Sequence, residues 1–214
     1  MGGADKVFAR LGGKPLLVHV VEAFVACRAL GQIVVVMSRE NIARGRRLLA
    51  RGGWEKPVEF CLGGERRQDS VAAGLQHLDR DWTWVVVHDA ARPLVTPGLV
   101  ERGLKAAVEV GAAVAAVPVA DTIKLAGADG TVKQTLERGS LYAVQTPQVF
   151  RRDIIDTAYH RVTGDATDDA SLVERAGYRV RLFPGDHDNI KVTTPEDLVV
   201  AAALWKERQR KGER

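Results

Sequence analysis

The sequence has no long hydrophobic run, which argues against a membrane-spanning or secreted protein. Among its 214 residues no apolar stretch approaches the ~18 residues that a membrane-spanning helix needs. Its first residues, Met-Gly-Gly-Ala-Asp-Lys, contain no hydrophobic segment typical of a secretory signal. We therefore expect a cytoplasmic protein with no membrane partner.

Cysteine is also scarce. Cys27 and Cys61 are the only two, each lies in an apolar stretch, and their spacing matches no metal-binding motif. Buried free thiols are the simplest interpretation of both, and such thiols suit a reducing compartment.

An excess of charge of one sign is missing as well, since the formal net charge is only +4. Much of that excess lies in the tail from Lys206 to Arg214 and in the segment from Arg44 to Arg51. Binding of nucleic acid needs a basic face with aromatic or recognition elements, and the sequence shows none. We expect no nucleic-acid partner, whereas a small anionic substrate remains compatible with a basic cleft.

Apolar residues are present in an ordinary proportion, 46%, which is enough for a sizeable core. Strand and helix patterns alternate along most of the chain. Buried strands are predicted at 33–37, 58–62, 82–87, 112–119 and 179–183. Helices are predicted at 15–29, 40–50, 70–78, 97 to just before 111, 167–176 and from 194 onward. The alternation predicts an α/β fold with a Rossmann-like, mostly parallel sheet and helices on both faces, in a single domain over 1–214.

One segment breaks this alternation. Residues 122–125 and 131–136 alternate apolar with polar side chains, and Gly127-Ala128-Asp129-Gly130 lies between them. The pattern predicts a β-hairpin with a glycine-rich turn. Because a two-stranded ribbon is marginally stable by itself, we expect this arm, residues 120–146, to pack on something, and a second subunit is one candidate.

The segment from Gly63 to Ser70, GGERRQDS, follows a strand and leads into a helix. Glycines there let backbone amides approach a ligand, and the helix N-terminus favours anions or oxygen acceptors. A plain turn capped by Asp69 or Ser70 explains the same pattern, so the motif alone decides nothing.

The segment from His88 to Pro93 is more informative, because it delivers a carboxylate to the end of a buried strand. Ligands of such sheets lie beyond the carboxyl ends of the strands. Asp89 is therefore a candidate ligand of Mg²⁺ or of a ribose, with helix capping as the alternative. For His88 we favour a structural hydrogen bond, and Arg92 either binds an anion or ties the loop to a carboxylate.

A second carboxylate and a lysine follow another strand, at Asp188 and Lys191. If Asp188 meets Asp89, the two would hold one Mg²⁺ on a triphosphate, and Lys191 would be a point charge on a phosphate. A surface lysine is the other interpretation of Lys191. Lys6 and Arg138, taken in isolation, are solvated surface charges.

Taken together, these segments resemble the 2-C-methyl-D-erythritol 4-phosphate cytidylyltransferase family. The matching pieces occur in family order along the chain: Asp5-Lys6, Gly13 to Leu17, 63–71, 88–93, Asp121-Thr122, Arg138, 145–148, Thr167-Asp168 and 188–197. The resemblance implies a nucleotidyltransferase fold and an arm-exchanged homodimer. It also implies Mg²⁺-assisted transfer of CMP from CTP to a sugar-alcohol phosphate, with pyrophosphate leaving.

The resemblance also implies roles for single residues. Lys6 and Lys191 match catalytic lysines that act on phosphate charge, and Asp89 and Asp188 match the metal side. The residues that match contacts to CTP are Gly64, Glu65, Ser70, Asp89 and Ala90. Those that match the acceptor side are Arg92, Thr122, Arg138, Thr146, Thr167 and Lys191. Thr122 and Arg138 lie on the arm, which in the family reaches the neighbouring subunit's site.

The sequence departs from the family at its start. Family members begin with a buried strand and a glycine-rich loop that holds the triphosphate, whereas residues 1–6 resemble only the end of that loop. We expect Met1 to be an internal methionine of a protein longer by roughly 15 to 25 residues. We also expect the 214-residue chain to bind CTP weakly.

Two alternatives stay open. A ribitol 5-phosphate cytidylyltransferase shares most of these motifs, and an inactive truncated remnant that only dimerises would lack the loop in the same way. A nicotinamide dehydrogenase is excluded, because no Gly-x-Gly-x-x-Gly follows a first strand.

Overall fold

The structure, a computed structural model, describes residues 6–50 and 52–212. The loop remnant expected at Met1 to Asp5 lies outside this part of the chain. Within these ranges no helix is both long enough and apolar enough to cross a bilayer.

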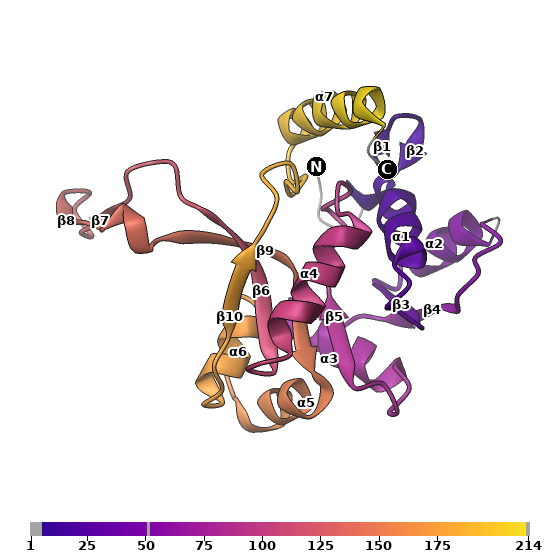
Figure 1. Cartoon of the computed structure of the whole chain (residues 1–214), viewed down its shortest axis with the longest axis horizontal. Helices are drawn as coiled ribbons and strands as arrows, with labels where there is room; N and C mark the ends of the chain where they lie inside the picture. Colours follow the sequence, from indigo (N-terminus) through magenta and orange to yellow (C-terminus); the bar gives the residue numbers. More distant parts are fainter. Residues whose placement is uncertain (1–5, 51, 213–214) are drawn as a thin grey trace.

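Helices and strands alternate through the body of the molecule, and one ribbon projects from it (Figure 1). In chain order the elements are η1 (Lys6–Phe8), β1 (Arg10–Leu11), β2 (Lys14–Pro15), α1 (Leu16–Ala26), β3 (Ile33–Met37), α2 (Ile42–Leu49), β4 (Val58–Leu62), α3 (Arg67–His77), β5 (Trp84–Val87), α4 (Pro97–Ala107), β6 (Ala112–Pro118), β7 (Lys124–Ala126), β8 (Val132–Thr135), η2 (Arg138–Ser140), β9 (Tyr142–Arg151), α5 (Arg152–Arg161), α6 (Asp169–Arg175), β10 (Arg181–Pro184) and α7 (Pro195–Lys211).

The core of the fold is a four-stranded sheet in the order β10-β6-β9-β5, with a second pair, β3 and β4, beside it. β10 runs parallel to β6 and β3 runs parallel to β4. The predicted α/β class is confirmed. β9 is antiparallel to both of its neighbours, so the sheet is more mixed than the sequence pattern suggested.

β9 and α5 were not predicted from the sequence. Proline cannot donate to a ladder, so Pro147 is an unusual residue inside a strand. In the structure the register shifts between Val114 and Ala116, so that Pro147 lies opposite an irregular stretch of β6. The strand therefore accommodates its proline at a bulge, and the Thr146–Pro147 peptide bond is cis.

Helices cover both faces of the sheet, as predicted. Successive residues of β6 alternate between two hydrophobic clusters, with Ala113 packing on the side of α1 and α4 and Val114 on the side of α5 and α6. Val149 and Phe150 of β9 divide in the same way and are fully buried. The sheet is thus a central layer with a hydrophobic cluster on each face.

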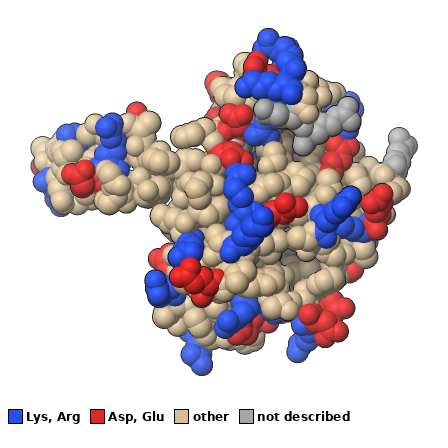
Figure 2. Space-filling view, viewed as in Figure 1, with Lys and Arg blue, Asp and Glu red and all other residues tan. Residues whose placement is uncertain are grey.

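The hairpin predicted between residues 122 and 136 is confirmed. β7 and β8 pair antiparallel, and the turn between them contains Gly130 at a φ of +80°, a conformation that favours glycine. The ribbon extends away from the body at the left of Figure 1. In Figure 2 uncharged surface separates its few charged side chains.

Candidate active site

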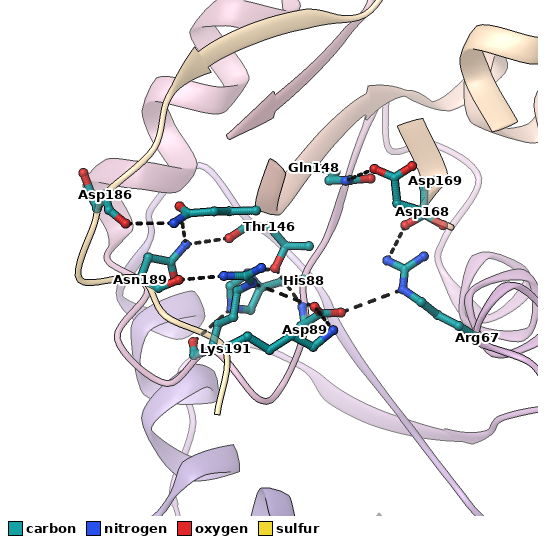
Figure 3. Close-up of polar contacts among 12 residues, drawn as sticks. Arg67, His88, Asp89, Thr146, Gln148, Asp168, Asp169, Asp186, Asn189 and Lys191 are labelled. Carbon is teal, nitrogen blue, oxygen red and sulfur yellow. Dashed lines mark hydrogen bonds and ion pairs between the residues drawn. The ribbon is translucent and has the colours of Figure 1, made fainter. Parts of the chain in front are cut away.

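The candidate site is centred on Asp89, which directly follows β5. Loops that follow β4, β5 and β10 meet here, and Figure 3 shows Asp89 between Lys191 and Arg67. The Asp89 carboxylate lies 2.8 Å from the Lys191 ammonium. Its distances to Arg67 Nε and Arg92 Nε are both 3.8 Å. One carboxylate therefore faces three cations.

Electrostatics keep Asp89 ionised although its side chain is only 18% exposed. Burial opposes the charged form, but the Lys191 ammonium and the Arg67 guanidinium outweigh it and hold the pKa of Asp89 below its usual value. The three cations are balanced by Asp89 and by Asp169, which pairs with Arg67, so one net positive charge remains and favours an anion.

His88 and Thr146 fix the backbone around Asp89. The Asp89 amide donates to Thr146 Oγ1 at 3.0 Å, and the same oxygen lies 3.0 Å from His88 Nδ1. His88 Nε2 lies 3.2 Å from the Arg92 carbonyl oxygen, which can only accept, so Nε2 carries the proton and Nδ1 accepts from Thr146. Burial lowers the pKa of His88 to about 4, so the ring is neutral at physiological pH.

A second set of contacts fixes the loop that carries Lys191. Arg92 Nη1 donates to the Asn189 carbonyl oxygen at 2.7 Å, and the Val192 amide donates to the Ala91 carbonyl oxygen at 2.8 Å. The buried side chain of Asn189 donates to the Thr146 carbonyl oxygen at 2.7 Å. The loops after β5 and β10 are thereby held together independently of Lys191 itself.

Arg67 connects Asp89 to the opposite side of the site. Its guanidinium lies 2.7 Å from the carboxylate of Asp169, which is fully buried, and Tyr159 donates to the same carboxylate at 2.5 Å. Burial and the neighbouring Asp169 charge raise the pKa of Tyr159, so it remains a donor. Arg67 is therefore held in place with its Nε directed toward Asp89.

The turn before α3 requires glycine for steric reasons. A Cβ on Gly64 would lie 2.4 Å from the Cβ of Asp69, and a Cβ on Gly63 would lie 2.6 Å from Ser70 Oγ. The Arg66 amide donates to Asp69 Oδ2 at 3.2 Å, and the Arg66 guanidinium pairs with the same carboxylate, which holds the start of the helix. The close approach brings the amides of the turn and the N-terminus of α3 to the same edge as Asp89.

Comparison with known proteins decides the family. The family model for IspD, 2-C-methyl-D-erythritol 4-phosphate cytidylyltransferase, matches residues 1–207. The chain belongs to this family. A 2-C-methyl-D-erythritol 4-phosphate cytidylyltransferase from Dehalococcoides mccartyi is 49% identical over 206 residues, covering 96% of this chain and 90% of that relative.

Solved structures agree with this cytidylyltransferase assignment. A 4-diphosphocytidyl-2C-methyl-D-erythritol synthase from Anaerococcus prevotii superimposes with a TM-score of 0.87 at 26% identity, covering 94% of each chain. A 2-C-methyl-D-erythritol 4-phosphate cytidylyltransferase from Thermus thermophilus gives a TM-score of 0.77 at 35% identity, covering 96% of this chain and 95% of that one.

The structure brings together only part of the cytidylyltransferase site that the sequence predicted. Around Asp89 and Ala90 it gathers Arg92, Thr146 and Lys191, and the Gly64 turn with Ser70 lies at the same edge. Glu65 and Thr167 are exposed without a hydrogen bond to this cluster among the residues described. Lys6 lies on η1, and its ammonium has no ion pair within the described part of the chain.

Thr122 lies shortly before β7 and Arg138 shortly after β8, so both belong to the arm, which extends away from the body (Figure 1). Arg138 Nη1 donates to the Ala120 carbonyl oxygen at 3.0 Å, which braces the base of the arm. Within one chain these two residues therefore stand outside the cluster.

The expected pair of metal ligands is arranged differently. Asp188 lies 3.5 Å from Arg208 Nε of α7, and the partners of Asp89 are Lys191, Arg67 and Arg92. Among the described residues no group of three or more His, Cys, Asp or Glu side chains could hold a metal. Each of the two carboxylates has its own cationic partners in this structure, and a Mg²⁺ site that they share stays a prediction.

Two members of the site were missed as functional residues in the sequence. Arg67 lies in the segment from Gly63 to Ser70, but nothing in its spacing indicated a role of its own. Asn189 lies between Asp188 and Lys191, and no role was predicted for it. The sequence did contain one signal for Arg67: two arginines closely follow the Gly-Gly pair at the end of a strand. For Asn189 no local signal exists, because its partners Gln145 and Thr146 lie more than forty positions away.

Proposed function

We propose that this chain transfers CMP from CTP to 2-C-methyl-D-erythritol 4-phosphate. A phosphate oxygen of the acceptor attacks the α-phosphorus, the bond from that phosphorus to the β-phosphate oxygen breaks, and pyrophosphate leaves. The attacking oxygen is already anionic, so the step needs no general base. Positioning and charge neutralisation then carry most of the rate enhancement.

The single observation that supports this best is the excess of positive charge around Asp89. Lys191, Arg67 and Arg92 converge on one carboxylate at the edge where the loops meet. Two anionic substrates that must approach each other need such a surplus, because their own charges repel. Lys191, with a side chain 41% exposed, is free to turn from Asp89 to a phosphate.

We assign the other predicted residues by their place around this centre. The Gly64 turn, with Glu65 and Ser70, would contact the cytosine edge, and Asp89 and Ala90 the ribose. Asp89 would also hold a Mg²⁺ ion, which when bound neutralises triphosphate charge. Arg92, Thr146 and Thr167 would face the acceptor, and Lys6 would add charge on the triphosphate.

We further propose that the protein works as a homodimer joined through the arm. Leu125 and Val132 on the ribbon are 50% and 61% exposed, and Tyr142 and Val144 at its base are exposed as well. Apolar side chains on a thin ribbon favour burial against a second subunit. In such a dimer Thr122 and Arg138 would complete the partner's site.

Subunit mixing tests the composite site. Arg138→Ala and Lys191→Ala subunits are each expected to form inactive homodimers, since each lacks one contributor to both sites. A mixed dimer would contain one intact site, so mixing the two after dissociation should restore activity that neither parent has. Arg138→Ala homodimers with normal activity would contradict the exchange.

We place the reaction in the cytoplasm. Cys27 and Cys61 are buried free thiols, and burial raises the pKa of both, which keeps them protonated and unreactive. Unpaired thiols suit a reducing compartment.

The acceptor is tested by pyrophosphate release. CTP with 2-C-methyl-D-erythritol 4-phosphate should give the fast reaction, and ribitol 5-phosphate the slow one. A preference for ribitol 5-phosphate would replace the proposed acceptor, and no release with either would support an inactive remnant.

A further inference from the structure

One oxygen of the Asp89 carboxylate faces two cations at different distances. Oδ2 lies 2.8 Å from Lys191 Nζ (Figure 3) and 3.8 Å from Arg92 Nε. Hydrogen bonds between oppositely charged groups are about 2.7 to 2.9 Å long, so only the contact with Lys191 is one. In this structure Lys191 therefore holds Oδ2, and Arg92 lies about 1 Å beyond hydrogen-bonding distance from it.

Arg92 Nε is a buried donor with no acceptor among the residues that the structure describes. Another nitrogen of the same guanidinium is anchored, since Nη1 donates to the Asn189 carbonyl oxygen at 2.7 Å. Burial lowers the pKa of Arg92 and the charge of Asp89 opposes this shift, but an arginine keeps its proton. Buried charged groups with an unmade hydrogen bond are rare and unfavourable. A carboxylate oxygen that becomes free nearby should therefore attract Arg92 Nε.

Arg67 differs from Arg92 in this respect. Its Nε lies 3.8 Å from the other oxygen of Asp89, Oδ1, but its Nη2 already lies 2.7 Å from Asp169. The Arg67 side chain is partly exposed, and its Nε is not among the buried donors without a partner. Of the two arginines, Arg92 thus gains more from a free Asp89 oxygen.

The backbone around Asp89 and Arg92 is fixed, so a new contact between them needs side-chain motion only. The Asp89 amide donates to Thr146 Oγ1 at 3.0 Å, and the Arg92 amide donates to the Asp89 carbonyl oxygen at 2.9 Å. The last torsion of an aspartate side chain is broad, so the carboxylate rotates at low cost. Such a rotation, with a small adjustment of the guanidinium, closes the remaining 1 Å or so.

We propose that Asp89 exchanges its partners when an anionic substrate binds: Lys191 Nζ turns to the substrate phosphate, and Arg92 Nε donates to Asp89 Oδ2 in its place. Arg92 is then a positioning residue, in addition to any contact with the acceptor, and keeps Asp89 paired while Lys191 acts elsewhere. The exchange lowers the cost of releasing Lys191, because one ion pair replaces another. The identity of the phosphate rests on the proposed function, but the exchange of partners does not.

NMR of the arginine Nε–Hε groups tests the exchange in the substrate-free protein without Mg²⁺. The signal that disappears in Arg92→Lys is that of Arg92. In Lys191→Ala the Asp89 Oδ2 atom is free, so the Arg92 Hε signal should move downfield and exchange with water at least about tenfold more slowly than in the wild type. Lys206→Ala, which removes an exposed lysine of α7, should leave the signal unchanged.

Inorganic phosphate is the probe for the step that involves substrate. Its addition to the wild-type protein should move the Arg92 signal downfield as Lys191→Ala does, because phosphate draws Lys191 away from Asp89. In Lys191→Ala the same titration should cause no further shift, since the exchange is already complete.

Steady-state kinetics measure the consequence for the reaction. Arg92→Lys keeps a positive charge but lacks the Nε–H group, so Lys191 should stay on Asp89. We expect the KM for the phosphate acceptor to rise about tenfold and the KM for CTP to change less than about twofold. Arg102→Lys alters an ion pair with Asp186 outside the Asp89 cluster and should leave both values unchanged.

Three results would overturn the proposal. These are an Arg92 signal that is the same in Lys191→Ala as in the wild type, a wild-type signal that saturating phosphate does not move, and an unchanged KM for the acceptor in Arg92→Lys. If Lys191→Ala does not fold, Lys191→Met keeps the length of the side chain without its charge and takes its place. If no acceptor supports release of pyrophosphate, the proposed reaction fails, and the Arg92 signal in Lys191→Ala still decides the exchange of partners.

Discussion

The Asp89 cluster and the β7–β8 arm are built on opposite principles. Around Asp89, charged groups are paired, and their backbone is held by hydrogen bonds among the loop after β5, the loop after β10 and strand β9. On the arm, apolar side chains such as Leu125 and Val132 are exposed, and the ribbon's own ladder is its main internal support.

The difference shows which contacts fix the position of the side chains in each region. The cluster is preorganised within one chain, which is what stabilisation of transition-state charge requires. The arm projects from the body with its apolar side chains exposed, and in the proposed dimer the partner subunit would fix its position. Changes in the cluster should therefore alter the chemistry directly, whereas changes on the arm should act through assembly.

The largest effect is expected from removing the charge of Asp89. Asp89→Asn leaves Lys191, Arg67 and Arg92 without their shared carboxylate and removes the proposed ligand of the ribose and Mg²⁺. We expect kcat/KM to fall by about 10² to 10³. Steady-state pyrophosphate release measures this.

Asp188→Asn is the matched control for that variant. Its carboxylate lies beside Arg208 of α7, so we expect less than about a threefold loss, as for other substitutions of partly exposed ion pairs. An equal loss of kcat/KM in both variants, with a raised Mg²⁺ requirement in each, would support a metal site formed by both carboxylates. It would contradict the different roles assigned to Asp89 and Asp188.

The next effect concerns the arm. Leu125→Asp with Val132→Asp places charge on its exposed apolar surface and should convert a dimer into monomers in sedimentation velocity. Lys133→Ser, on the same ribbon, should leave the dimer intact. A double variant that stays dimeric would show that the arm does not form the interface.

The neutral His88 predicts a pH dependence of stability. Its pKa in the folded protein is about 4, against a usual value near 6.5, so between these pH values the unfolded chain binds a proton that the folded protein does not. The contribution of His88 to the free energy of unfolding should therefore fall as pH drops through this window, by up to about 3 kcal/mol, and this contribution should level off below pH 4.

Urea denaturation at pH 7.5 and pH 4 measures this decrease. His88→Gln should show a smaller difference between the two pH values, whatever its absolute stability. His77→Gln, which replaces an exposed histidine of α3, should keep the full difference. An unchanged difference in His88→Gln would mean that another group is responsible.

The sequence predicted much of this architecture because local signals agreed with it. The apolar run at 33–37 corresponds to β3, and the Thr-Pro start at 194 with its two acidic residues corresponds to the first turn of α7. β9 was not predictable, because its proline is tolerated only through a bulge against β6, which is a tertiary feature.

The residues of the candidate site also fall into two groups, those indicated by local sequence patterns and those brought together only by tertiary contacts. Asp89 was readable from its position after a buried strand, and the Gly64 turn from its glycines. The ion pair of Asp188 with Arg208 joins residues twenty positions apart on a loop and a helix, and no periodicity reveals it. The roles of Lys6 and Arg138 came from the family resemblance alone.

The smallest effect is expected at the turn before α3. Gly64→Ala would place a Cβ 2.4 Å from the Cβ of Asp69, so the turn must shift, and with it the contact between Asp69 and Arg66. We expect a loss of about 1 to 2 kcal/mol in unfolding free energy and a several-fold rise in KM for CTP with little change in kcat. Gly98→Ala in α4 has its nearest atom at 4.0 Å and should be neutral or slightly stabilising. A Gly64→Ala variant with a normal KM for CTP would show that the turn does not contact the nucleotide. The preorganised cluster would then include Arg67 but not the Gly64 turn.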